Sequence, residues 1–492
     1  MARPNVIVIM ADQLKATALP IYGNPDVRTP VLDRFAEESV RYDLAFAAHP
    51  LCTPSRVSLW TGAYPHDHGV RTNEAQAPKS RDNYLRQFHQ AGYRLALIGK
   101  NHCFGSEDLA LFDEVEEFSH RGRTHASDAR DDRFRSWLNT DAEFDRLWHA
   151  HPTPVPQEEC PAARITEEAS RFVRTAAEPF LLWMSLPEPH EPYYAPEPFA
   201  SMYDPERIHL PEGALEDDTA EPVRRRLYRE LCGFDDMDEA SLRTAVATYY
   251  AMVSFVDSCI GRLLDTLTEA DRDKDTIVVF LADHGDFAGE RGLMVKCNSL
   301  IDALTRVPLV IRIPGIDAAG DTVADPVSLI DVMPTVAHIA SVTAPTGSRG
   351  RVLPGLGIPT EARSAVFAEY GAGSPPMTYD QGVSRGHAQR DQLRPLLRAA
   401  EAEGRSKMVR TRRWKYIYDP MDPVDELYDM EADARELHNL AADPAHGGIV
   451  ADMRRRLLDW SIRTEDAEPT ALYFDPGDFS PRVEPHYAPF GA

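Results

Sequence analysis

Five short apolar runs, far apart in the chain, dominate the hydrophobic pattern. Each is dense in Val, Ile, Leu or Phe and shows little of the polar alternation of a half-exposed strand. This pattern is typical of strands buried on both faces, as in a parallel sheet covered by helices. The predicted strands are Asn5–Met10, Arg94–Gly99, Phe180–Leu186, Thr276–Leu281 and Val307–Ile313.

Longer stretches with helical spacing of apolar residues lie between these runs. The clearest cover Leu242–Leu267 and Tyr84–Ala91. The alternation of strands and helices predicts an α/β fold, an open doubly wound sheet with helices on both faces. We expect this catalytic domain to occupy residues 1–371.

The last part of the chain has a different pattern and predicts a smaller α+β subdomain with a tail over residues 372–492. Ala372–Glu403 is polar and resembles an inserted loop. The tail from Thr464 is rich in Pro, Asp and aromatic residues, which is compatible with a homo-oligomer. A short antiparallel sheet and a helix are predicted at Lys407–Arg410, Lys415–Tyr418, Glu426–Tyr428 and Gly448–Arg463.

Charge and hydropathy narrow the choice of partners. The 492-residue chain has a formal net charge of −25, so nucleic acid and anionic membranes are poor partners. An anionic substrate would then need a local cationic site. The apolar run Val6–Met10 is too short for a secretory signal, and no run reaches the roughly 18–20 residues of a membrane span. We therefore expect a cytoplasmic protein that is not bound to a membrane.

The six cysteines do not form CxxC pairs, which argues against a structural zinc site. A disulfide framework is also unexpected in a cytoplasmic chain of this size. Five of the cysteines are predicted to be small buried apolar residues. Cys52 is the exception, because of the residues around it.

Polar side chains follow four of the predicted strands directly. In open α/β sheets, ligands bind beyond the carboxyl ends of the strands, so these side chains are expected to meet at one edge. Any one of them alone would be explained as a helix cap or a structural histidine. Their coincidence favours a single site, formed by Asp12 and Gln13, Lys100 and His102, His190, and Asp283 and His284.

The chemistry of these side chains falls into two groups. The oxygen donors Asp12, Gln13 and Asp283, with the imidazole of His284, suit a divalent cation such as Ca²⁺, Mg²⁺ or Mn²⁺. A second group is cationic or able to transfer protons, and would hold an oxyanion and protonate a leaving group. Its members are Lys100, His102, His190, Lys296 and Arg56.

The segment Leu51–Arg56, with the sequence Leu-Cys-Thr-Pro-Ser-Arg, resembles the signature of type I (formylglycine-dependent) sulfatases, a family of the alkaline phosphatase superfamily. Val57–Val70 resembles the continuation of that signature. Ala282–Asp286, Gly289–Gly292 and Lys296 resemble the later catalytic block of the family, so the resemblance covers most of the chain. It implies an alkaline-phosphatase-like fold, with a doubly wound mixed sheet and helices on both faces.

The resemblance implies that a formylglycine-generating enzyme oxidises Cys52 to formylglycine (3-oxoalanine), whose hydrate is the nucleophile. A helix beginning near Pro54 would direct its positive end at residue 52. The implied ligands of the divalent metal, Ca²⁺ first among the candidates, are Asp12, Gln13, Cys52, Asp283 and His284.

The resemblance also implies roles for the other polar residues. Arg56 and Lys100 steady the nucleophile, while His190 and Lys296 hold the sulfate and help the alcohol to leave. His102 takes the proton of the second hydroxyl, and Asn73 contacts the substrate. The implied substrate is the sulfate ester of a small organic molecule.

Other interpretations stay open at this point. Cys52 could be a plain thiol nucleophile, although thiol phosphatases separate their Cys and Arg more widely, or an inert buried residue. A phosphonate monoester hydrolase or phosphodiesterase would share the nucleophile and metal, but the pair Lys100 and His102 favours sulfate. A non-catalytic binding protein would need unmodified Cys52 or broken ligand positions. We identify no aromatic cage for a quaternary ammonium group, and expect the substrate pocket to come from residues 103–165, 190–240 and 372–405.

Overall fold

The computed structural model describes residues 3–465 except 74, 80, 141–145, 216–220, 298, 317–318, 372–404 and 421–424. Its centre is a nine-stranded sheet with the order β13-β2-β12-β10-β1-β8-β4-β5-β6. The four strands with polar residues at their ends lie side by side and parallel at its middle, as predicted. They are β1 (Asn5–Ala11), β4 (Arg94–Gly99), β8 (Phe180–Leu186) and β10 (Thr276–Ala282).

The predicted strand Val307–Ile313 is divided into two. Pro308 lacks the amide hydrogen that a continuous strand requires. The first part, β11 (Arg306–Val307), pairs with β3 (Ala45–Phe46) in a separate small sheet. The second part, β12 (Leu309–Arg312), runs antiparallel to β10, so the main sheet is mixed.

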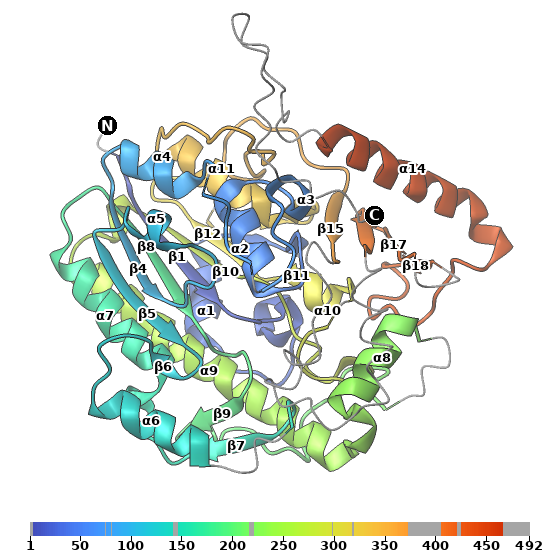
Figure 1. Cartoon of the computed structure of the whole chain (residues 1–492), viewed down its shortest axis with the longest axis horizontal. Coiled ribbons are helices and arrows are strands. Elements are labelled where there is room, and N and C mark those ends of the chain that lie inside the picture. The colour runs from blue at the N-terminus through green and yellow to red at the C-terminus, as the bar shows by residue number, and fades with distance from the viewer. Residues whose placement is uncertain are drawn as a thin grey trace, which may run out of the picture.

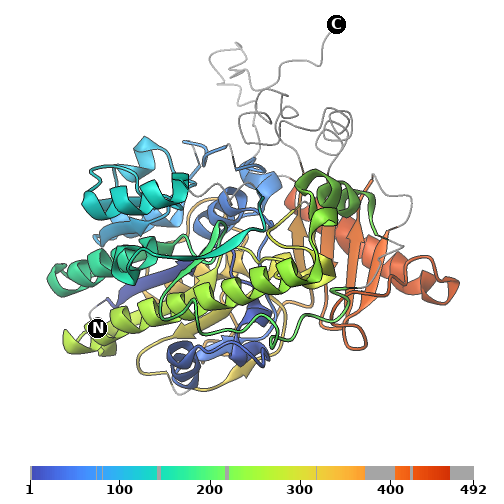
Figure 2. The same ribbon diagram turned by 90° about the horizontal axis from the view of Figure 1, so that it is seen from below.

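Helices cover both faces of the sheet (Figures 1 and 2). The helix predicted over Leu242–Leu267 is α9 (Glu239–Glu269), which packs against α7 (Pro161–Thr175). On the other face lie α2 (Cys52–Thr61), α4 (Tyr84–Gln90) and α11 (Val332–Ile339), which contact one another. The doubly wound α/β prediction is therefore confirmed.

The predicted short antiparallel sheet is present in the C-terminal part, with a fourth strand in addition to the three predicted. Its strands are β15 (Val366–Glu369), β16 (Lys407–Arg410), β17 (Trp414–Tyr418) and β18 (Glu426–Asp429), and α14 (Gly447–Thr464) packs on β16 and β17. Strand β15 precedes residue 371, where we expect the domain boundary, and the boundary stays a prediction. The expected loop Ala372–Glu403 and the tail from residue 466 lie outside the described residues.

The remaining strands and longer helices complete the layers. Within the described part of the chain, no helix combines the length and apolar character needed to cross a membrane. The remaining strands and α-helices of the described residues are α1 (Pro30–Glu37), β2 (Val40–Tyr42), α3 (Pro65–His68), α5 (Ser106–Leu109), β5 (Glu114–Ser119), β6 (Gly122–Arg123), α6 (Ala129–Thr140), β7 (Ala150–Thr153), β9 (Tyr193–Pro196), α8 (Val223–Cys232), α10 (Asp302–Thr305), β13 (Thr322–Val323) and β14 (Val327–Ser328).

Candidate active site

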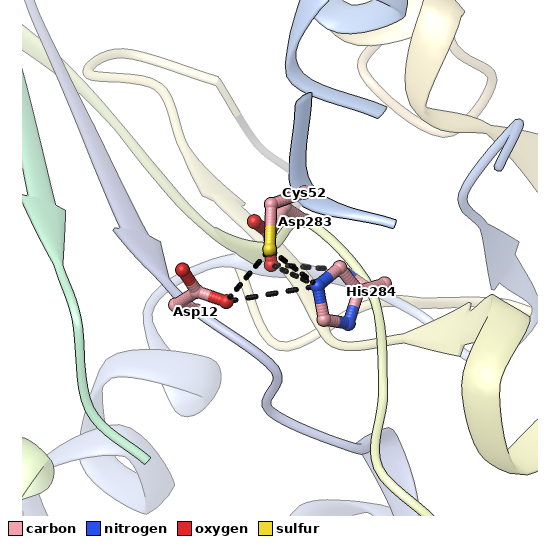
Figure 3. Close-up of side chains that lie close together, drawn as sticks. All are labelled: Asp12, Cys52, Asp283 and His284. Atoms are coloured by element: carbon pink, nitrogen blue, oxygen red, sulfur yellow. Dashed lines mark hydrogen bonds and ion pairs between the residues drawn. The ribbon is translucent and has the colours of Figure 1, made fainter. Parts of the chain in front are cut away.

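Four predicted ligands meet at the carboxyl edge of the sheet (Figure 3). Asp12 follows β1, and Asp283 and His284 follow the neighbouring strand β10, so the register of these strands brings the three side chains together. Cys52 approaches from the start of α2. All four are buried, and their ligand atoms lie within 4.8 Å of one another. Nδ1 of His284 donates to the carbonyl of Gly285, which leaves Nε2 facing the cluster.

Helix α2 begins at Cys52, two residues before the predicted start near Pro54. Cys52 is therefore in the first turn, where the free backbone N–H groups favour negative charge. Its Sγ lies 3.1 Å from Nε2 of His284 and 3.6 Å from Oδ1 of Asp12. The helix start is held by Ser55, whose hydroxyl donates to the carbonyl of Asp283 over 2.5 Å.

Arg56 lies on the same helix and is completely buried. Its Nε donates to Oδ2 of Asp283 over 2.8 Å, and its NH2 nitrogen donates to Oδ2 of Asp12 over 3.1 Å. Burial disfavours the charged guanidinium, but Asp283 and Asp12 outweigh this and raise the pKa of Arg56. Arg56 thus fixes the spacing of both carboxylates.

Lys100 reaches the nucleophile from the end of β4. Gly99 before it has φ 121°, and a Cβ there would lie 1.9 Å from the carbonyl oxygen of Ser185, so this turn requires glycine. Nζ of Lys100 forms a short ion pair with Asp12 and lies 3.7 Å from Sγ of Cys52.

The charges around Cys52 favour the anionic form of its side chain. Burial and Asp12 raise the pKa of Cys52, but Lys100, Lys296 and His284 outweigh them and hold it well below its ordinary value. Burial likewise opposes ionisation of Asp12, yet Lys100 leads the nearby charges that lower its pKa. The acidic chain therefore contains the local cationic site that an anionic substrate requires.

Lys296 and His190 lie on another side of the same site. Nζ of Lys296 is 2.7 Å from Nε2 of His190, and Nδ1 of His190 donates to the carbonyl of Glu191 over 2.6 Å. Burial, His120 and Lys296 lower the pKa of His190, so it is neutral and accepts from Lys296. Burial lowers the pKa of Lys296, but Cys52 and the nearby carboxylates raise it by more than burial lowers it. The pKa of Lys296 is therefore raised, and the ammonium stays charged.

Gln13 lies between the cluster around Cys52 and the pair formed by Lys296 and His190. Its backbone is in the left-handed region, with φ 65°. Its Oε1 accepts from Lys296. Its Nε2 donates to Glu191 over 2.8 Å and to Asp286 over 2.6 Å. Sequence reasoning missed the partly exposed Glu191 and the buried Asp286 as site residues, although both stand in segments that directly follow predicted strands. Burial raises the pKa of each.

His120 is the other residue that sequence reasoning missed. It follows β5, and its Nε2 lies 2.8 Å from Nζ of Lys100, while its ring stacks on His190 with 3.9 Å between centroids. Burial and Lys100 lower its pKa, so neutral His120 accepts from Lys100. The side chain of His102 is exposed, and its carbonyl accepts from the hydroxyl of Thr53 over 2.6 Å.

Asn73 supports the nucleophile loop. Its Oδ1 accepts from the amide of Thr53, the residue after Cys52, over 3.1 Å. The structure thus brings together Asp12, Gln13, Cys52, Arg56, Lys100, His190, Asp283, His284 and Lys296, with Asn73 beside them and His102 at the surface. The roles of these residues stay predictions.

A cysteine at a helix start lies between buried side chains that could hold a metal ion and several cations, at the carboxyl edge of an α/β sheet. This arrangement is typical of a hydrolase of anionic esters. A sequence model described as Sulfatase matches residues 4–342. The chain therefore belongs to the sulfatase family of the alkaline phosphatase superfamily, and it is a sulfuric ester hydrolase.

Two relatives and a solved structure support this family assignment. Choline-sulfatase of Rhizobium meliloti is 30% identical, with 94% of this chain and 88% of that protein covered. Arylsulfatase of Clostridium perfringens is 26% identical, with 93% and 94% covered. Among solved structures, the phosphonate monoester hydrolase of Silicibacter pomeroyi aligns with a TM-score of 0.75 at 26% identity and covers 94% of this chain and 96% of its own.

Proposed function

We propose that this protein hydrolyses the sulfate ester of a small organic molecule, with formylglycine derived from Cys52 as nucleophile and a divalent metal beside it. One observation carries the proposal: Sγ of Cys52 lies in the first turn of α2, within 3.7 Å of Asp12, His284 and Lys100. The small-molecule substrate is supported by the choline-sulfatase relative.

The residues of the cluster fit a hard or borderline cation. Asp12 and Asp283 offer carboxylate oxygens, His284 offers Nε2, and the amide oxygen of Gln13 lies nearby. This donor set favours Ca²⁺, with Mn²⁺ and Mg²⁺ as alternatives. When bound, the cation would polarise the sulfate group and lower the pKa of the attacking hydroxyl.

The chain's other residues would divide the proton and charge transfers. One hydroxyl of the hydrated formylglycine would attack sulfur, forming a new S–O bond while the S–O bond to the alcohol breaks. Lys296, hydrogen bonded to His190, would give the departing alcohol its proton. Lys100 would stabilise the negative charge on the attacking oxygen.

Release of sulfate would regenerate the aldehyde, which requires a base for the proton of the remaining hydroxyl. The family resemblance gives this role to His102, and the structure offers neutral His120 beside Lys100 as a second candidate. A serine could not complete this step, because it has no second hydroxyl with which to expel the sulfate.

Phosphonate monoester hydrolysis is the second candidate function. It is favoured by the similarity to the hydrolase of Silicibacter pomeroyi. The pair Lys100 and His102, which resembles that of the sulfatases, favours the sulfate ester instead.

Mass spectrometry of the tryptic peptide Tyr42–Arg56 tests the nucleophile. The protein should be produced with a formylglycine-generating enzyme and supplied with Ca²⁺. We expect the peptide to be lighter than its cysteine form, and the fraction modified to scale with turnover of nitrophenyl sulfate. Turnover by protein whose peptide keeps the cysteine mass would contradict the proposal. A fully modified protein that binds the ester without hydrolysing it would favour a binding protein.

A further inference from the structure

A small pocket of about 40 Å³ lies beside the segment that precedes Cys52. His49, three residues before Cys52, forms one wall. Arg71, two residues before Asn73, forms another wall. The remaining walls come from the small C-terminal sheet and the segment before β16, at Glu369, Tyr370, Arg405 and Lys407.

The charges of this pocket do not balance. Glu369 is the carboxylate of its lining, and both oxygens are engaged: Oε1 accepts from the amide and ring of His66, and Oε2 accepts from Lys407 over 2.7 Å. Arg71 and Arg405 line the same space, and neither forms an ion pair with a carboxylate in the described part of the chain. Two guanidinium charges are therefore in excess, in a protein whose net charge is −25.

Two buried donors in the pocket walls also lack acceptors. Nδ1 of His49 accepts from the amide of Leu51 over 3.1 Å, so its ring proton is on Nε2. Burial lowers the pKa of His49 to about 3, which keeps the ring neutral. Within the described residues, neither Nε2 of His49 nor Nε of Arg71 has a hydrogen-bond partner, although both atoms are buried. A buried donor without an acceptor is costly unless a ligand supplies one.

We infer that this pocket binds a second anionic group of the substrate, a carboxylate or a sulfonate-like oxyanion, through Arg71, Arg405 and His49. The inference rests on the proposed function and deepens it, because the substrate then becomes a sulfate ester whose alcohol part carries its own negative charge. A trimethylammonium group would meet two uncompensated guanidinium charges here. Choline sulfate is accordingly a poor substrate for this protein, unlike for the relative named after it.

Two aryl esters that differ only in charge test the inference: meta-carboxyphenyl sulfate and meta-carbamoylphenyl sulfate. On the modified full-length protein, we expect kcat/KM to be at least about tenfold higher for the carboxylate, as for a hydrogen bond to a charged group. Arg71→Gln and Arg405→Gln should each bring the ratio close to one while leaving the carbamoyl ester unchanged. A meta-sulfophenyl ester compares the two anions, and a gain with either supports the inference.

Arg412→Gln is the matched control, since Arg412 is an exposed arginine on the hairpin between β16 and β17, and it does not line the pocket. It should keep the full preference for the carboxylate. Equal kcat/KM values for the charged and neutral esters in the unmutated protein would overturn the inference, as would a preference that survives both Arg71→Gln and Arg405→Gln. The carbamoyl ester reports the proposed sulfatase activity by itself, so failure of the inference leaves its turnover intact.

Discussion

The two sides of Cys52 are built differently. On the side proposed to bind the metal, here called the metal-binding side, Asp12, Asp283 and His284 stand at the ends of adjacent parallel strands and are completely or almost completely buried. On the leaving-group side, His190 and Lys296 come from loops and are partly accessible. The first side is held by strand register and by Arg56, whereas the second depends on hydrogen bonds between side chains.

This difference separates two parts of the proposed mechanism. The metal-binding side would activate the nucleophile, and the leaving-group side would recognise the ester and deliver the proton. Activation of the nucleophile needs fixed distances between charged groups, which a buried sheet edge provides. Recognition of the ester and proton delivery can be changed by substituting loop residues without disturbing the core. We therefore expect mutations on the metal-binding side to abolish activity, and those on the leaving-group side to change it according to the substrate.

The largest effect is expected at the nucleophile itself. Cys52→Ala removes the residue from which formylglycine is made, and should lower kcat for nitrophenyl sulfate by at least about 10³-fold, as loss of a nucleophile does. Cys160→Ala is the control, because Cys160 is also buried but lies outside the cluster. Comparable losses in both variants would show that Cys52 has only a structural role.

Removal of metal should have the next largest effect. Chelation should reduce turnover by at least about 100-fold and lower Tm, because Asp12 and Asp283 then lack the cation that separates their charges. Addition of Ca²⁺ should restore both. Elemental analysis should find bound metal in the protein and much less in Asp283→Asn. Full activity with no metal bound would remove the metal from the mechanism.

Lys296→Met tests the leaving-group side. Loss of the ammonium beside His190 should lower kcat/KM by about 10²-fold or more for an alkyl sulfate, whose alcohol needs a proton to leave. For nitrophenyl sulfate, whose phenolate leaves readily, the loss should be several times smaller. An equal loss with both esters would assign Lys296 to binding of the sulfate group rather than to protonation.

The smallest of these effects is expected from the histidines near Lys100. His120→Gln removes the acceptor of Lys100 and should lower kcat/KM by about tenfold. The pKa of His120 lies well below 6.5, so in the unmutated protein its contribution should persist at neutral pH and be lost only as pH falls through that lowered pKa. The exposed His102 is the comparison: a larger loss in His102→Gln would return the base role to His102.

The sequence predicts most of the metal-binding side, because its residues directly follow strands with an unmistakable apolar pattern. His120 also follows a strand, but β5 reads Glu-Val-Glu-Glu-Phe-Ser, and this polar strand near the edge of the sheet does not stand out in the hydrophobic pattern. Glu191 and Asp286 lie in the segments that directly follow β8 and β10, but their contacts with Gln13 depend on the left-handed backbone conformation of Gln13. The charged pocket joins His49, Arg71 and Glu369, which only the tertiary structure brings together.

The measurement that tests the central claim most directly is the ratio of kcat/KM for nitrophenyl sulfate to that for nitrophenyl phenylphosphonate. Both esters release the same phenolate, so the ratio reports the preference for the sulfuryl over the phosphonyl centre. The protein should carry formylglycine at residue 52 and bound metal. Because the pair Lys100 and His102 resembles that of the sulfatases, we predict a clear preference for the sulfate. A clear preference for the phosphonate would contradict the proposed sulfatase function and favour a phosphonate monoester hydrolase built on the same nucleophile and metal site.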